Sequence, residues 1–224
     1  MDDFVQAFLN LDIISQASPI LWRGLWQTLL LAVMVVPLGL IGGVILALLS
    51  TAPLRWVRIL AAGWVDLFRA IPPLVLLVFL YAGLPFAGLD VGAWGAVAIG
   101  FFLNTGAYYG EVLRAGIDSV PRGQTEAARS TGLSQAQTLA FVVLPQAVRN
   151  VMPDLISNTV EVVKLTSIAS VVALPELLFQ ARQAQNVTYN ASPIVAAAVA
   201  YFLLLWPLVR LMSRLENKAM AGRG

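Results

Sequence analysis

The sequence contains no cysteine and no histidine among its 224 residues. Without cysteine there is no disulfide framework, no thiolate metal ligand and no cysteine nucleophile. Without histidine there is no imidazole ligand and no histidine general base. Charged residues are also scarce, at 12% of the chain. These absences exclude most enzyme mechanisms, and we predict neither a catalytic residue nor a metal site.

Two short motifs are missing as well. No G-x-x-x-x-G-K-[ST] phosphate-binding loop is present, so a nucleotide that drives any process here must bind another chain. The N-terminal stretch MDDFVQAFLNLDIISQASP has neither the basic region nor the small-residue cleavage site of a signal peptide. We therefore expect residues 1–24 to stay on the mature protein as a periplasmic or interfacial segment, in part as a short helix.

Apolar sequence is what the chain has in abundance. Hydrophobic residues make up 59% of it, and several apolar runs exceed the roughly 18 residues that suffice to cross a bilayer. This composition predicts an all-α, polytopic membrane protein. Five transmembrane helices are expected, at about Leu25–Leu49, Trp56–Leu84, Ala93–Leu113, Val151–Leu174 and Pro193–Met212.

Glycine and proline mark two of these spans. Gly39, Gly42 and Gly43 in the first span would let a neighbouring helix approach closely. Pro72 and Pro73 in the second span remove two backbone donors and disfavour helical geometry just before them. We expect a kink or break there, which a bilayer tolerates where it is buried in protein or lines a water-filled cavity.

The basic residues indicate how the chain crosses the membrane. With five spans, ten of the fourteen lysines and arginines fall on one side, which makes that side cytoplasmic. The N-terminus is then outside, residues 25–213 form the transmembrane domain, and residues 214–224 form a cytoplasmic tail. Glu176 falls on the outer side. Because the basic residues lie in short loops rather than in one dense patch, no nucleic-acid partner is expected.

The stretch EAARSTGLSQAQTLAFVVLP, from Glu126 to Pro145, is polar and small-residue-rich and lies between long apolar runs. It predicts a short helix that stops at Gly132. Ser134 begins a second helix, and Gln137 completes a capping box. Such a helix at the membrane surface is a plausible rigid knob for a partner's groove, and the alternative is an ordinary amphipathic loop helix.

The pattern of this stretch, Glu126-Ala127-Ala128 with Gly132 and Leu144-Pro145, resembles the EAA loop by which membrane subunits of bacterial ABC importers dock onto their ATPase. Further motifs resemble the polar amino acid permeases of the histidine and glutamine importer group. They are Gly24-Leu25 with Thr28, Phe68-Arg69 with Pro72, Tyr81 with Gly83-Leu84-Pro85, Asn104 to Tyr108, Glu111, Arg114, Val120-Pro121 with Gly123-Gln124, Gln146-Ala147, and Lys164 with Thr166-Ser167 and Pro175-Glu176-Leu177.

The resemblance implies a type I permease in the bacterial inner membrane, paired with itself or with a paralogue. It further implies two ATPase subunits that bind ATP and Mg, an external solute-binding protein and an amino acid substrate; this chain would hold no cofactor of its own. Residues 116–148 would be the EAA loop. The residues that would transmit force to the ATPase are Glu126, Ala127, Ala128, Arg129 and Gly132.

Polar residues inside the spans are the predicted substrate-binding residues, because an ionisable group at the bilayer centre costs roughly 2.5 to 3.5 kcal/mol and seldom persists without a use. They are Arg69, Asn104, Thr105, Glu161, Lys164, Thr166 and Ser167. Lys164 or Arg69 would hold the carboxylate of a zwitterion. Glu161 or the Asn104 carbonyl would receive its ammonium group.

Each prediction has a structural alternative. Glu161 and Lys164 are three residues apart, and they would form a self-satisfied ion pair at a dimer interface. Arg69 would pair with Asp66 or snorkel to the membrane surface. Asn104 and Thr105 would form hydrogen bonds between helices that stabilise their packing. Glu111 and Arg114 are expected to be a structural pair in any case.

Two departures from the family pattern concern the substrate. Ala70-Ile71 stands where Gly-Thr is usual, and Leu165 stands where Asp, Glu or Asn is usual. Our hypothesis is that this subunit alone does not recognise a cationic side chain. Two other functional classes stay open, a secondary transporter or channel for a small zwitterion and a membrane-embedded enzyme, although no inverted repeat and no catalytic motif supports them.

Overall fold

The computed structural model describes the backbone of residues 2–221 and the side chains of residues 3–207, 209 and 210. All regular structure in this part of the chain is helical, which confirms the all-α prediction. The elements are α1 (Asp2–Phe8), α2 (Leu11–Ser50), α3 (Arg55–Ala70), α4 (Pro73–Val78), η1 (Phe79–Gly83), η2 (Leu84–Ala87), α5 (Gly92–Asp118), α6 (Arg122–Ser130), α7 (Gln135–Thr138), η3 (Leu139–Val143), α8 (Leu144–Asn150), α9 (Met152–Leu165), η4 (Thr166–Val172), α10 (Leu177–Thr188) and α11 (Ser192–Ala221).

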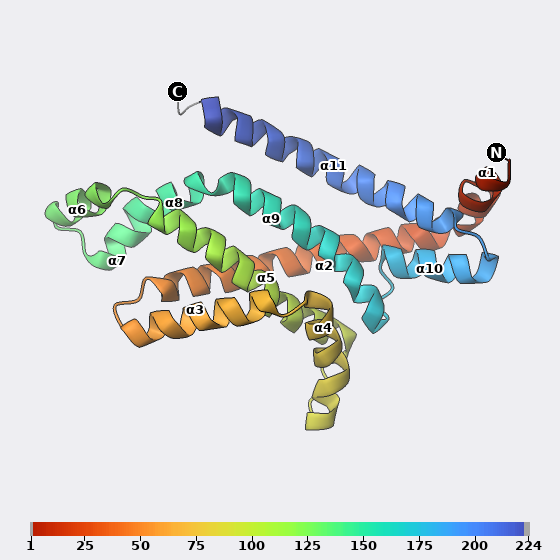
Figure 1. The fold of residues 1–224 in the computed structure, drawn as a ribbon, viewed down its shortest axis with the longest axis horizontal. Coiled ribbons are helices and arrows are strands. Elements are labelled where there is room, and N and C mark those ends of the chain that lie inside the picture. The colour runs from red at the N-terminus through yellow and green to blue at the C-terminus, as the bar shows by residue number, and fades with distance from the viewer. Residues whose placement is uncertain (1, 222–224) are drawn as a thin grey trace.

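Figure 1 shows α6 and α7 at one end of the molecule and α1 and α10 at the other, with α2, α5, α9 and α11 running between them. α2 begins much earlier than the predicted first span, because the Asn10 side chain caps it by accepting hydrogen bonds from the N–H groups of Asp12 and Ile13. The boundary predicted after residue 24 therefore lies inside one continuous helix.

Small residues bring α2 and α5 into close contact in the core. A Cβ atom added to Gly39 would collide with the Thr105 side chain, and one added to Gly43 would collide with Tyr109. At Gly42 an added Cβ would lie 3.1 Å from the Phe102 carbonyl oxygen. The prediction that these glycines let a neighbouring helix approach is confirmed, and the neighbour is α5.

The double proline breaks the chain between α3 and α4. Arg55–Ala70 and Pro73–Ala87 are bent by 96° relative to each other. Ile71 adopts an extended conformation with φ −80° and ψ 125°, as a residue before proline prefers. The predicted break is confirmed, and Figure 1 shows α4 directed away from the axis of α3.

Length and composition identify fewer spans than the five predicted. Within the described residues, the helical segments Asp3–Ser50 and Met152–Val172 are long and apolar enough to cross a membrane. The bent pair at the double proline makes a third if it counts as one span. The apolar part of α11, Ser192–Pro207, is shorter, and α5 is not among the candidates. The number of spans and their orientation stay a prediction.

Glu176 is fully buried at the start of α10. Its carboxylate accepts hydrogen bonds of 2.8 Å from the N–H groups of Leu178 and Phe179 and from the Tyr201 hydroxyl. Burial raises the pKa of this carboxyl, and the three hydrogen bonds oppose that shift. Glu176 therefore serves as an internal helix cap that joins α10 to α11.

Candidate functional site

The predicted coupling residues lie on or next to α6, which extends beyond the helical bundle (Figure 1). Of the side chains in α6 only Ala128 is buried. Glu126, Ala127 and Arg129 are exposed, and so is Gly132, which follows the helix. The face that these residues form is therefore free in this chain to meet a partner.

Gly132 ends this helix with a left-handed backbone conformation, φ +92°. The Gly132 N–H donates to the Arg129 carbonyl at 3.1 Å, and the Leu133 N–H donates to the Ala128 carbonyl at 3.4 Å. A Cβ atom at Gly132 would meet nothing within 4 Å. The requirement for glycine is thus conformational, and the predicted helix end is confirmed.

The segment that follows is fixed by local hydrogen bonds and a small apolar cluster. Ser134 Oγ accepts from the Gln137 N–H at 3.2 Å, and Gln137 Oε1 accepts from the Ser134 N–H at 2.8 Å. This confirms the predicted capping box. Val120, Val143 and Ala147 pack together at the base of the loop. The exposed helix α6 is therefore carried on an ordered support.

A second group of predicted residues surrounds the double-proline break. In an unbroken helix the carbonyls of Phe68 and Arg69 would accept from residues 72 and 73, but proline has no N–H. Asn104 Nδ2 donates to the Phe68 carbonyl at 2.7 Å, and the Tyr108 hydroxyl lies 3.5 Å from the Arg69 carbonyl oxygen. Asn104 and Tyr108 are one turn apart on α5. Thus α5 supplies the donors that the prolines remove.

Arg69 itself points toward α5. Its guanidinium lies 5.4 Å from the centre of the Tyr108 ring, and its Nη1 lies 4.0 Å from Glu111 Oε1. No hydrogen bond or ion pair joins it to Asp66 within the described side chains, so the predicted pairing with Asp66 is wrong. Arg69 is 40% exposed, which leaves much of the guanidinium open to a ligand.

The pairing predicted for Glu111 and Arg114 is confirmed. Arg114 Nε donates to Glu111 Oε2 at 3.0 Å and Arg114 Nη2 to Glu111 Oε1 at 2.6 Å. Arg114 Nη1 also donates to Asp118 Oδ2 at 2.7 Å. A line of alternating charges therefore runs from Arg69 at the end of α3 to Glu111, Arg114 and Asp118 on α5.

Glu161 and Lys164 form a separate cluster on α9. Lys164 Nζ lies 2.6 Å from Glu161 Oε1, and the side chains are 50% and 58% exposed, respectively. Ser167 donates its hydroxyl to the Lys164 carbonyl at 2.9 Å. Across the described side chains no hydrogen bond or ion pair connects this cluster to Arg69 or Asn104. The predicted substrate residues thus fall into two groups.

Comparison with known proteins identifies the family. Residues 39–220 match the family described as binding-protein-dependent transport system inner membrane component. The chain is 34% identical over 200 residues to the probable glutamine ABC transporter permease protein GlnP of Bacillus subtilis (strain 168), covering 88% of this chain and 92% of that protein. The chain belongs to this family of permeases. The permease is also 31% identical over 202 residues to the arginine transport system permease protein ArtQ of the same organism. The match covers 89% of this permease and 92% of ArtQ.

The fold of the permease agrees with its assignment to this family. A solved structure described as an amino acid ABC transporter with histidines superposes with a TM-score of 0.83 at 32% identity, covering 92% of the permease and 96% of that chain. The resemblance to type I importer permeases of the amino acid group and the expected location in the inner membrane are confirmed.

Besides Asn104, two further predicted substrate residues of the permease are buried. Thr105 donates its hydroxyl to the Phe101 carbonyl at 2.5 Å, and it is 2% exposed. Thr166 donates to the Val163 carbonyl at 2.7 Å, and it is fully buried. Both hydroxyl protons are thus used within their own helices. In this arrangement the two threonines support packing.

Sequence reasoning gave no role to Tyr108, which both stacks on Arg69 and approaches its carbonyl. A signal for a donor was present: each proline frees the carbonyl four residues before it, so the Phe68 and Arg69 carbonyls need donors from elsewhere. Asn104 and Tyr108 are polar side chains one helical turn apart on a predicted span, where such donors can be sought. The bond between the hydroxyls of Tyr109 and Thr159, 2.7 Å long, had no such signal.

Proposed function

We propose that this permease is the membrane subunit of an ATP-driven, binding-protein-dependent importer that carries a polar amino acid by alternating access. Family membership and relatives named for glutamine and arginine support the substrate class. Their identities to this chain are nearly equal, at 34% and 31%, so similarity does not select one amino acid. The observation that carries the proposal is the exposed helix α6, ended by Gly132.

In the proposed topology α2, the bent pair of α3 and α4, α5, α9 and α11 form five spans. The N-terminus is outside, and α6 and the tail of residues 214–224 are in the cytoplasm. The positive charges of the predicted inner loops support this orientation. Residues 1–24 would then lie at the outer surface, although residues 11–24 share helix α2 with the first span.

The proposed assembly contains a second permease, either this chain or a paralogue, with two ATPase subunits and an external solute-binding protein. ATP and Mg bind the ATPase, and this chain contributes no cofactor and no catalysis. The lack of a phosphate-binding loop supports that division. ATP-driven closure of the ATPases would move the α6 helices of the two permeases together and turn the pore outward.

The substrate would meet Arg69 and the Glu161–Lys164 cluster, because these charged side chains lie within the predicted spans and are 40% to 58% exposed. A guanidinium suits a carboxylate, and a carboxylate suits the substrate ammonium. Leu165 in place of an acidic or amide residue supports a neutral or acidic amino acid over a cationic one. Asn104 would hold the end of α3 through its hydrogen bond to the Phe68 carbonyl, and it would thereby position the neighbouring Arg69.

The test is the ATPase activity of the complex in proteoliposomes, with the ATPase and binding protein encoded beside this chain. Arginine, histidine, glutamine, glutamate and aspartate are each added to the binding protein. We expect glutamine, or glutamate and aspartate, to stimulate ATP hydrolysis and amino acid uptake. A permease that forms no complex with the ATPase would overturn the proposal, and a stable complex that no amino acid stimulates would overturn the substrate class.

A further inference from the structure

An open hollow of about 910 Å³ lies between α1 and the turn that joins α10 to α11. Figure 1 shows this end of the molecule opposite the end that carries α6 and α7. We call it the Tyr189 hollow. Its polar lining consists of amides, one carboxylate and a phenol, which belong to Asp3, Gln6, Gln185, Asn186, Asn190 and Tyr189.

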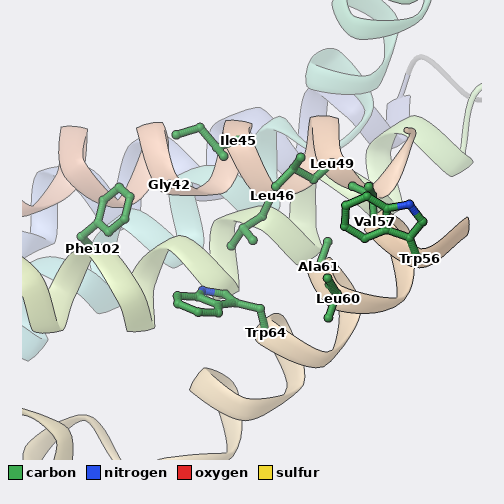
Figure 2. Close-up of a pocket in the computed structure, with 10 residues that line it drawn as sticks. All are labelled: Gly42, Ile45, Leu46, Leu49, Trp56, Val57, Leu60, Ala61, Trp64 and Phe102. Carbon is green, nitrogen blue, oxygen red and sulfur yellow. The ribbon is translucent and has the colours of Figure 1, made fainter. Parts of the chain in front are cut away.

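The groove between α2, α3 and α5 has a different lining. Its side chains are apolar, and Leu46, Leu60 and Trp64 are among those that Figure 2 draws. Amides and carboxylates lose their hydrogen bonds in apolar surroundings and keep them only against water or a polar partner. The Tyr189 hollow therefore has the lining of a surface that meets water or another protein rather than hydrocarbon.

Tyr189 ends α10 in a left-handed backbone conformation, with φ 50° and ψ 34°. Many helices end in this way, but the residue is usually glycine and sometimes asparagine, because a bulky side chain is disfavoured there. The Tyr189 ring is 95% exposed, and among the described residues it makes no hydrogen bond and no ring contact. Residues in disfavoured conformations cluster at functional sites, so this tyrosine points to a contact outside the chain.

The turn that carries Tyr189 is fixed to α1. Asn190 Nδ2 donates to the Gln6 carbonyl at 2.8 Å, and the Ala191 N–H donates to the Ala7 carbonyl at 3.1 Å. The ring is therefore held on an ordered base. A partner that binds an ordered surface loses less conformational entropy than one that must first order it.

α10 is anchored at its other end as well. The Leu177 N–H donates to Thr28 Oγ1 on α2 at 3.1 Å, and Glu176 accepts from the Tyr201 hydroxyl on α11 at 2.8 Å. A Cβ atom added to Gly24 of α2 would lie 2.8 Å from Leu177 Cα. The hollow is thus connected through α10 to α2 and α11, which run toward the end of the molecule that carries α6 (Figure 1).

We propose that the Tyr189 hollow is the docking surface for the external solute-binding protein, with the Tyr189 ring as its anchor. This inference rests on the proposed function, because it takes the α1 end of the molecule as the outer side. The family to which the chain belongs is described as binding-protein-dependent. A tyrosine surrounded by amides suits a protein partner, because interfaces combine aromatic anchors with polar, hydrated surroundings. A small ligand suits the hollow less well, because a ring that is 95% exposed encloses nothing.

The test is the affinity of the permease–ATPase complex in nanodiscs for the binding protein encoded beside this chain, measured in the presence of the five amino acids named above. Tyr189→Asn removes the ring and leaves a residue that tolerates the left-handed conformation. It should weaken binding about thirtyfold, as the loss of a strong interface anchor does. Tyr189→Phe keeps the ring and should retain most of the affinity.

Phe86→Ala is the matched control. Phe86 is as exposed as Tyr189, at 95%, but it lies on η2 and does not line the hollow. Unchanged affinity of Tyr189→Asn, or an equal loss in Phe86→Ala, overturns the inference and leaves the proposed function intact. A parent complex that contains the ATPase but does not bind the binding protein overturns the proposed function, and the inference with it.

The bilayer and a second copy of this chain are the competing occupants. Because the chain has no cysteine, Asn186→Cys places a single thiol at an exposed position of the hollow and leaves Tyr189 unchanged. Labelled with benzophenone maleimide and illuminated, this variant should crosslink to the binding protein. Crosslinks to lipid or to another permease in place of the binding protein overturn the proposal.

Discussion

Asn104 is the buried side chain that holds the end of α3. It is 2% exposed, its Nδ2 bonds the Phe68 carbonyl at 2.7 Å, and its Oδ1 has no hydrogen-bond partner among the described residues. An unpaired buried oxygen is costly, and its persistence fits a residue that serves more than packing.

Replacing Asn104 should destabilise the permease. Asn104→Ala removes the donor and leaves the Phe68 carbonyl buried and unpaired, at a cost of about 1–3 kcal/mol. The measurement is the thermal midpoint of the purified permease in detergent. Asn158→Ala is the control, because the Asn158 side-chain nitrogen is already without a partner among the described residues. An equal change in the midpoint for both variants would contradict the role given to Asn104.

The Glu161–Lys164 pair offers a prediction that separates stability from transport. Because both side chains are about half exposed, the pair should contribute less than about 1 kcal/mol to stability. Glu161→Gln and Lys164→Gln should therefore leave the thermal midpoint nearly unchanged and lower amino acid uptake at least tenfold. Uptake in proteoliposomes is compared with Asp12→Asn, an exposed carboxylate at the start of α2. Normal uptake by both variants would assign the pair a purely structural role.

At the scale of elements, α6 depends on one backbone conformation. Gly132→Arg forces a side chain onto a residue at φ +92°, which costs about 1–2 kcal/mol locally, and places bulk on the proposed docking face. We expect a permease that still enters the membrane but no longer couples ATP hydrolysis to uptake. Gly132→Asn is the control, because asparagine tolerates this conformation better than other residues. Retained uptake at normal ATPase turnover in Gly132→Arg would remove α6 from the mechanism.

Local chemistry made several elements predictable. The break at Pro72-Pro73, the helix end at Gly132 and the Ser134 capping box each depend on residues adjacent in sequence. The partner of Arg69 was not predictable in this way, because Glu111 lies 42 positions further along, on α5. The early start of α2 was missed for a different reason: membrane hydropathy marks where a bilayer begins, whereas a capping residue marks where a helix begins.

At the scale of the whole molecule, the orientation is open to a direct test. The absence of cysteine allows single thiols to be placed at the two ends of the molecule. Val187→Cys on α10, at a site 79% exposed, should react with a membrane-impermeant maleimide in intact cells. Ala136→Cys on α7 should react only after permeabilisation. The cysteine-free parent gives the background, and the reverse labelling pattern would invert the proposed topology.

The two prolines have a consequence for how such a permease changes over time. The bend lies between α3 and α4, but the donors that restrain it, Asn104 and Tyr108, belong to α5. Substitutions on α5 can therefore stiffen or loosen the joint while the prolines stay in place. The place of the bend and its resistance to bending are therefore set by different residues: the prolines fix the first, and Asn104 and Tyr108 contribute to the second.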